Sequence, residues 1–111
     1  MSMNMEGRST EFRVKVGATA TLQLTIGLDL SNTVTFATGK WKVWKPDGTL
    51  VINGNIVYTT RATGIVSYTL TSSDTATANA GNWSGEVELL DSSGGISEQT
   101  KTFNFVIEES Y

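Results

Sequence analysis

The stretch FRVKVGATATLQLTIGLDL, residues 12–30, alternates apolar and polar side chains almost without interruption. Apolar residues occupy the even positions from Phe12 to Leu30, and the odd positions between them are mostly charged residues or Thr. Alternation with a period of two is typical of strands that bury one face. Gly17 interrupts the pattern and predicts a break between two strands, at about 12–16 and 19–27. The segment therefore predicts a β protein.

The composition of the whole chain agrees with this interpretation. Thr occurs 17 times among the 111 residues, and Thr, Val and Ile together account for 32. These β-branched residues fit a pleated, half-buried surface better than a helix. We therefore expect an all-β protein.

Further strands follow at short intervals, separated by residues that favour turns. The stretch KPDGT, residues 45–49, is a strong hairpin signal because Pro, Asp and Gly each favour a turn conformation. A shift in parity, from even Val34 and Phe36 to odd Trp41 and Val43, predicts a bulge or bend near 37–39. A capping pattern at 71–74, followed by Gly81, predicts one short helical turn near 72–79. The remaining strands are predicted at 33–45, 50–53, 55–60, 64–70, 83–89 and 97–108, with turns at Asn53–Asn55 and 91–95.

About seven short strands at this spacing favour a two-sheet antiparallel immunoglobulin-like β-sandwich. A small closed barrel is the structural alternative. The first ten residues, MSMNMEGRST, contain no apolar run and predict a flexible N-terminal arm. We therefore expect an arm at 1–10 and a single domain at 11–111.

The absence of His and Cys excludes several kinds of chemistry. Metal sites built on imidazole or thiolate, and nucleophiles paired with His, cannot form. We expect no enzyme activity and no cofactor. The net charge of −3 and eight scattered Lys and Arg residues argue against nucleic acid as a partner. No apolar run approaches the ~20 residues that span a bilayer, so we expect no membrane partner.

The acidic residues offer weak candidates for a site. Glu86 and Glu88 project from the same face of a predicted strand, about 6–7 Å apart, and paired acids of this kind occur in glycosidases. We favour a solvated outer face, opposite a core face of Trp83, Val87 and Leu89. Glu108 and Glu109 are interpreted as solvated charges. Loop carboxylates could bind calcium or simply stabilise turns, and we favour turns for Asp29, Asp47, Asp74 and Asp91.

The stretch KWKVWK, residues 40–45, supplies the candidate contact residues. Trp41 and Val43 face one way on a strand, while Lys40, Lys42 and Trp44 face the other. An exposed Trp beside Lys side chains could stack on a sugar ring or anchor a protein interface. The favoured alternative is that Trp44 packs against a cross-strand neighbour such as Tyr58.

An ordered set of motifs along the chain resembles a known family. The motifs are FRVKVG at 12–17, GLDLS at 27–31, KPDGT at 45–49, GIVSYTLT at 64–71, DTA at 74–76 with GNW at 81–83, and TFNFVI at 102–107. In this order they resemble the immunoglobulin-like amino-terminal domain of phage baseplate upper proteins and related small phage tail proteins. The stretch 33–39 departs from the family pattern, and the chain ends soon after the last strand.

The resemblance implies a non-enzymatic structural module of the phage virion, in the tail or baseplate. Its implied partners are other phage structural proteins, with copies of itself in a ring among them. Its implied location is the virion, after synthesis in the bacterial host cytoplasm. The alternative, which rests on Trp44 and the abundant Ser and Thr, is a carbohydrate-binding or adhesion β-sandwich module. The candidate contact residues for either function are Lys40, Lys42 and Trp44.

Overall fold

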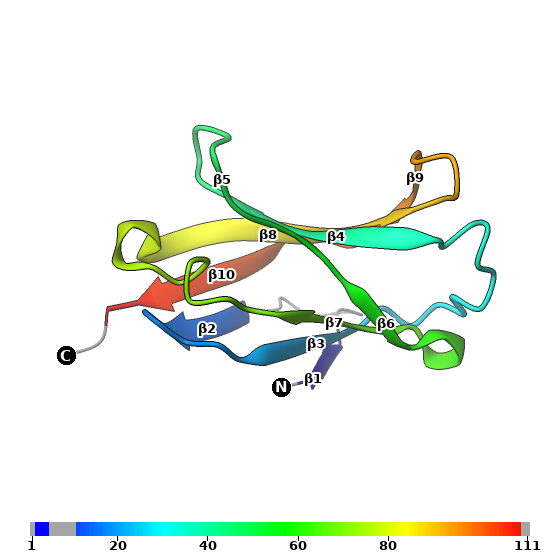
Figure 1. Ribbon diagram of the computed structural model, residues 1–111, viewed down its shortest axis with the longest axis horizontal. Helices are drawn as coiled ribbons and strands as arrows, with labels where there is room; N and C mark the ends of the chain where they lie inside the picture. Colours follow the sequence, from blue (N-terminus) through cyan, green and yellow to red (C-terminus); the bar gives the residue numbers. More distant parts are fainter. Residues whose placement is uncertain (1, 5–10, 110–111) are drawn as a thin grey trace.

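The computed structural model describes residues 2–4 and 11–109, and in these residues ten strands divide between two facing sheets (Figure 1). One sheet has the strand order β1-β3-β7-β6, and the other has the order β2-β10-β8-β4-β5, with β9 also paired to β8. This layout confirms the predicted all-β, immunoglobulin-like sandwich. The strands are β1 (Ser2–Asn4), β2 (Glu11–Lys15), β3 (Thr21–Thr25), β4 (Thr38–Trp44), β5 (Leu50–Asn55), β6 (Val57–Thr60), β7 (Ile65–Thr69), β8 (Gly81–Leu90), β9 (Ile96–Gln99) and β10 (Phe103–Glu108).

Aromatic side chains form the centre of the core between the two sheets. The ring centroid of Phe12 lies 5.1 Å from that of Trp41 and 5.1 Å from that of Phe103, both in edge-to-face geometry. Trp41 and Val43 are fully buried, as the alternation in KWKVWK predicts. In the stretch 12–30 the prediction holds for Phe12, Leu22, Leu24 and Leu30, which are buried, whereas Ala20 and Leu28 are exposed.

Two strand pairs depart from the predicted antiparallel arrangement. β2, the first strand of the six-stranded sheet along the chain, runs parallel to β10, the last one, with Phe12 opposite Phe105. β1 runs parallel to β3. β1 belongs to the stretch 1–10 that the sequence predicts to be a flexible arm. Residues 5–10 of that stretch lie outside the described residues, and the division into arm and domain stays a prediction.

The strand predicted over 33–45 begins only at Thr38. Before it, Asn32 closes a turn: its side-chain oxygen accepts hydrogen bonds from the backbone N–H groups of Val34 and Thr35. Its carbonyl oxygen accepts a third, from Phe36 N–H. An Asn side chain that satisfies nearby backbone groups competes with strand pairing. The parity shift between Phe36 and Trp41 therefore reflects a turn before the strand and not a bulge within it.

The strand predicted over 97–108 is divided into β9 and β10, both paired to β8. At the interruption, Thr100 keeps the pairing with Val87. Its backbone N–H donates to the carbonyl oxygen of Val87 at 3.0 Å, and its hydroxyl oxygen accepts from Val87 N–H at 2.9 Å. A side chain thus replaces one backbone carbonyl, and the buried residues Phe103, Phe105 and Ile107 all lie after the break, in β10.

The turn predicted at Asn53–Asn55 is absent from the described residues, because β5 runs through Gly54 to Asn55. The chain then crosses from the six-stranded sheet to the other sheet at Ile56, whose N–H donates to Gly39 O at 3.1 Å. Figure 1 shows this segment crossing from β5 down to β6. The prediction of two short strands was therefore correct, but the link between them is a crossing between sheets.

The helical content is confined to two short 3-10 turns, Arg61–Thr63 and Thr77–Asn79, in the part of the chain that is described. The second lies within the predicted range 72–79. The capping pattern forms before it, since Thr71 and Asp74 exchange side-chain-to-backbone hydrogen bonds of 2.9 and 3.2 Å. Neither of these helical segments has the length or apolar character needed to cross a membrane.

Candidate interaction surface

The three candidate contact residues share the outer face of the six-stranded sheet. Lys40, Lys42 and Trp44 alternate along β4 with the buried residues Trp41 and Val43, as predicted. All three are half-buried, because β5 and β8 flank β4 on both sides. β4 is therefore an interior strand, between the central strand β8 and the edge strand β5.

The lysines on this face have acceptors within the protein. Lys42 Nζ lies 2.8 Å from Glu88 Oε1, and the Glu88 side chain keeps only 10% of its exposure. Lys40 Nζ donates to Asn55 Oδ1 at 2.6 Å. The two lysines are thus held flat against the sheet, which orders their aliphatic chains and neutralises the charge of Lys42.

The predicted solvated face of Glu86 and Glu88 is wrong for Glu88, which is buried, and Glu86 is only partly exposed. β9 causes this difference, because Gln99 lies opposite Glu88 and donates from its side-chain nitrogen to both carboxylates at 3.2 Å. Burial, followed by the nearby charge of Glu88, raises the pKa of the Glu86 carboxyl above its ordinary value. The two acids are therefore part of a polar network with Lys42 and Gln99, which the sequence prediction missed.

Trp44 does not pack against Tyr58, so that prediction was wrong. Tyr58 lies on β6 in the other sheet, where Arg61 stacks over its ring at 4.0 Å. Trp44 instead lies opposite Leu50 on β5 and Ser84 on β8. Leu50 is 49% exposed, and a register shift between Val43 and Trp44 accompanies this pairing. The pair Trp44 and Leu50 forms the apolar part of the candidate surface.

Trp83 is partly buried and packs against the core, in line with its predicted place on the core face of β8. Its indole N–H donates to Asn79 O at 2.8 Å. Lys45 Nζ lies 5.2 Å from the ring centroid, which places a cation over the indole face. Trp83 is therefore held by the 3-10 turn and the hairpin, and its ring is not a free contact.

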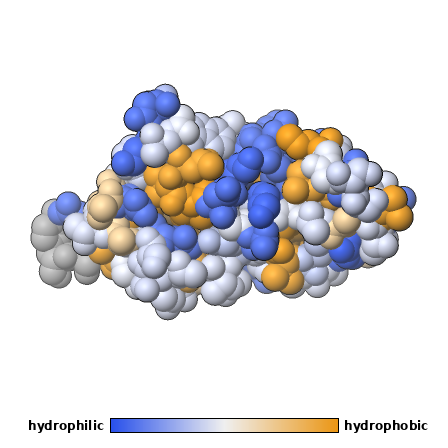
Figure 2. Space-filling view, turned by 45° about the horizontal axis from the view of Figure 1, so that its top comes forward, coloured by the Kyte–Doolittle hydropathy of each residue, from blue (hydrophilic) through white to orange (hydrophobic). Residues whose placement is uncertain are grey.

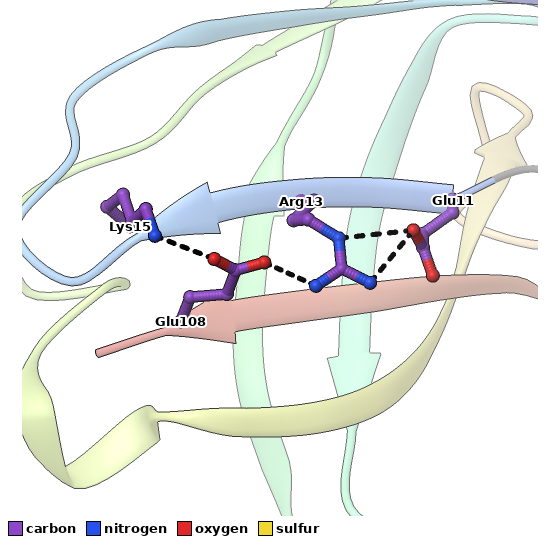
Figure 3. Close-up of polar contacts among 4 residues, drawn as sticks. All are labelled: Glu11, Arg13, Lys15 and Glu108. Atoms are coloured by element: carbon purple, nitrogen blue, oxygen red, sulfur yellow. Dashed lines mark hydrogen bonds and ion pairs between the residues drawn. The ribbon is translucent and has the colours of Figure 1, made fainter. Parts of the chain in front are cut away.

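A second charged cluster occupies the edge of the same sheet (Figure 3). Glu108 on β10 reaches two cations on β2: Lys15 Nζ at 2.7 Å and the Arg13 guanidinium, which also contacts Glu11. The hydrogen bonds from Arg13 and then Lys15 lower the pKa of Glu108 to about 2. Glu108 is thus an ion-pair partner and not a free tail charge. The sequence could not show this, because it depends on the parallel pairing of β2 with β10.

The loop carboxylates each accept hydrogen bonds within their own turn, which confirms the favoured interpretation. Asp29, Asp47 and Asp91 accept from backbone N–H groups two residues further along, and the donors are Ser31, Thr49 and Ser93. Asp74 accepts from Thr71 N–H and from the Tyr68 hydroxyl. Among the described residues, no three Asp, Glu, His or Cys side chains come together as metal ligands would.

Comparison with solved structures shows the same fold elsewhere. The N-terminal domain of ORF48 from phage TP901-1 matches with a TM-score of 0.67 over 96% of this chain and 94% of its own, at 12% sequence identity. CopC from Methylosinus trichosporium OB3b matches with a TM-score of 0.50 over 89% of this chain and 86% of its own, at 16% identity. No protein-family model and no curated protein matches by sequence. The first match confirms, at the level of the fold, the resemblance to amino-terminal domains of phage proteins.

Proposed function

We propose that this chain is a structural module of a phage particle that acts by binding other phage structural proteins and not by catalysis. The observation that carries the proposal is the fold shared with an N-terminal domain of a phage protein over nearly the whole of both chains. The absence of His and Cys from the sequence supports a role without nucleophilic or metal catalysis. Its place is then the virion, after synthesis in the host cytoplasm.

The contact surface in this proposal is the outer face of β4, with Lys40, Lys42 and Trp44. Two features support it. The face is ordered before any partner arrives, since both lysines are held by Asn55 and Glu88, so binding immobilises fewer side chains. Trp44 and Leu50 add an apolar spot among polar groups, and Trp is over-represented at the anchoring positions of protein interfaces.

The test follows the chain through particle assembly. Phage particles and assembly intermediates are purified from cells that express the chain within its phage genome, and the chain is detected by immunoblot. We expect it in the particles, retained after a high-salt wash. Its absence from both particles and intermediates would overturn the proposal.

The contact surface is tested with a matched pair of charge reversals. Lys40→Glu alters the proposed face, and Lys101→Glu makes the same change at an exposed residue between β9 and β10. We expect Lys40→Glu to lower incorporation into particles several-fold and Lys101→Glu to leave it unchanged. Equal incorporation of both variants would show that the outer face of β4 is not the contact surface, and it would not contradict the proposed role in the particle.

The alternative of a carbohydrate-binding module rests on the half-buried Trp44, whose ring could stack on a sugar. A glycan array distinguishes the two functions. Binding that is lost in Trp44→Ala would favour the carbohydrate module, whereas an array without any binding supports the particle role.

A further inference from the structure

Strand β5 forms one edge of the six-stranded sheet, and its sequence lacks the usual protection of an edge. Residues 48–60, which contain β5 and β6, include no charged residue and no Pro. Natural sheets protect their edges with charged side chains, Pro or a covering segment, because an open edge pairs with other strands. In the described part of the chain, β5 pairs with β4 on one side and with no strand on the other.

The opposite edge of the same sheet is protected in the usual way. β2 carries Glu11, Arg13 and Lys15 at alternate positions, and all three side chains are exposed. Arg13 and Lys15 pair with Glu108, and Arg13 also pairs with Glu11, which leaves a row of charge along that edge. The two edges of one sheet thus differ, and only β5 is left uncharged.

The backbone of β5 is oriented to accept another strand. Ile56 N–H bonds to Gly39 O, and hydrogen-bonded pairs recur at every second residue of an antiparallel strand. Gly54 and Ile52 are therefore also in hydrogen-bonded pairs with β4. Asn53 and Asn55 occupy the alternate positions, so their backbone N–H and C=O groups point away from β4. Both Asn side chains are exposed. Figure 2 shows this side of the molecule, where a hydrophobic group over β5 is followed by a hydrophilic stretch.

We propose that β5 pairs antiparallel with β5 of a second copy of this chain, centred on Asn53, and joins two six-stranded sheets into one. We infer a second copy as the partner because β5 is complementary to itself. An Asn amide carries donors and an acceptor, so each Asn53 can bond to its own symmetry mate. No like charges meet across the two-fold axis, since the strand has none. Because each copy uses the same edge, the assembly closes at two copies and does not grow into a filament.

This inference stands on the geometry of β5 and goes beyond the phage role. A contact of one strand from each copy lies at the small end of protein interfaces, so we expect a reversible dimer seen only at high concentration. Light scattering coupled to size-exclusion chromatography of the full chain, from about 10 to 500 μM, measures its mass. The expected result is a shift from monomer towards dimer across this range.

Two variants locate the contact. Asn53→Lys places like charges opposite each other and is expected to abolish the dimer, whereas Thr19→Lys makes the same change at an exposed position before β3. The native chain has no Cys, so Asn53→Cys introduces a single thiol. Hydrogen-bonded antiparallel partners have Cα atoms about 5.5 Å apart, within the range of a disulfide. Asn53→Cys is therefore expected to form a covalent dimer under mild oxidation, and Thr19→Cys is not.

A chain that stays monomeric at all concentrations, or a dimer that persists in Asn53→Lys with an unchanged circular dichroism spectrum, overturns the inference. Equal cross-linking of the two Cys variants does so as well. These outcomes differ from failure of the proposed function. If the chain is monomeric in solution but is present in purified particles, only the dimer proposal is contradicted. If the chain dimerises but is absent from particles, only the proposed phage role is contradicted.

Discussion

The indole of Trp41 and the phenol of Tyr68 stack between the two sheets, with ring centroids 5.9 Å apart and planes inclined by 17°. Trp41 comes from β4 and Tyr68 from β7, so the pair joins the sheets at their centre. The Tyr68 hydroxyl donates to Asp74 Oδ2 at 2.6 Å. Gly54, opposite Trp41 on β5, provides the space, because a Cβ there would lie 2.3 Å from Tyr68 Cε1.

Gly54→Ala is expected to destabilise the protein by about 1–3 kcal/mol, because the added methyl group displaces the Tyr68 ring from its stack. Urea unfolding followed by Trp fluorescence measures the loss. Gly95→Ala is the matched control, since a Cβ there meets only the Asp91 carboxylate, at 3.3 Å on an exposed loop. Equal stability of the two variants would show that Gly54 is not required for the stack.

Lys42→Met is expected to cost about 1–3 kcal/mol, because it leaves the buried carboxylate of Glu88 without its cation. Lys40→Met is the control and should cost less than about 1 kcal/mol, since its partner Asn55 is neutral and exposed. Adding Glu88→Gln to Lys42→Met should recover most of the loss. Chemical denaturation of the two single variants and the double variant measures the coupling, and additive losses would contradict it.

Thr100→Val is expected to destabilise the fold by about 1–3 kcal/mol, because Val cannot accept the hydrogen bond from Val87 N–H. Hydrogen exchange at the Val87 amide should accelerate in the variant. Thr102→Val, an exposed change two residues further along, is the control and should leave both stability and exchange unchanged. Unaltered protection of the Val87 amide in Thr100→Val would show that another acceptor takes over.

Glu108 is expected to titrate near pH 2 in the folded protein, because Arg13 and Lys15 stabilise its charged form. A lowered folded-state pKa contributes stability that is complete above the unfolded value of about 4.5 and is lost as the pH falls towards 2. Carbon-13 NMR of the side-chain carboxyl measures this pKa. In Arg13→Gln the pKa should rise towards the unfolded value, and an unchanged pKa would exclude Arg13 as the main cause.

Much of the fold could be predicted because it follows from local alternation. Phe12, Leu22 and Leu24, together with the pair Trp41 and Val43, lie on the faces that the alternation predicts to be buried, since a strand presents alternate residues to one side. The turn at Pro46–Gly48 follows from its own residues in the same way: Thr49 N–H bonds to the Asp47 carboxylate. These features need no knowledge of which strands are neighbours.

The rest depends on contacts between distant residues. Nothing in the local sequence around Glu108 indicates Arg13, which lies 95 positions away and becomes its neighbour only through the parallel pairing. The burial of Glu88 depends likewise on Gln99, and Trp44 meets Leu50 and not Tyr58 because the chain changes sheets at Ile56. On the candidate surface, the shared face of Lys40, Lys42 and Trp44 could be predicted, but the partners that hold the lysines could not.

The parallel pairing of β2 with β10 determines how the sandwich responds to mechanical load. β2 lies near the start of the chain and β10 near its end, and both point the same way. A pull that separates residue 11 from residue 108 therefore slides the two strands past each other. The five paired positions from Glu11 to Lys15 then bear the force together, whereas strands peeled from one end would break one bond at a time. Tension between residues 11 and 108 thus loads the β2–β10 pair in shear, the direction in which paired strands resist rupture most.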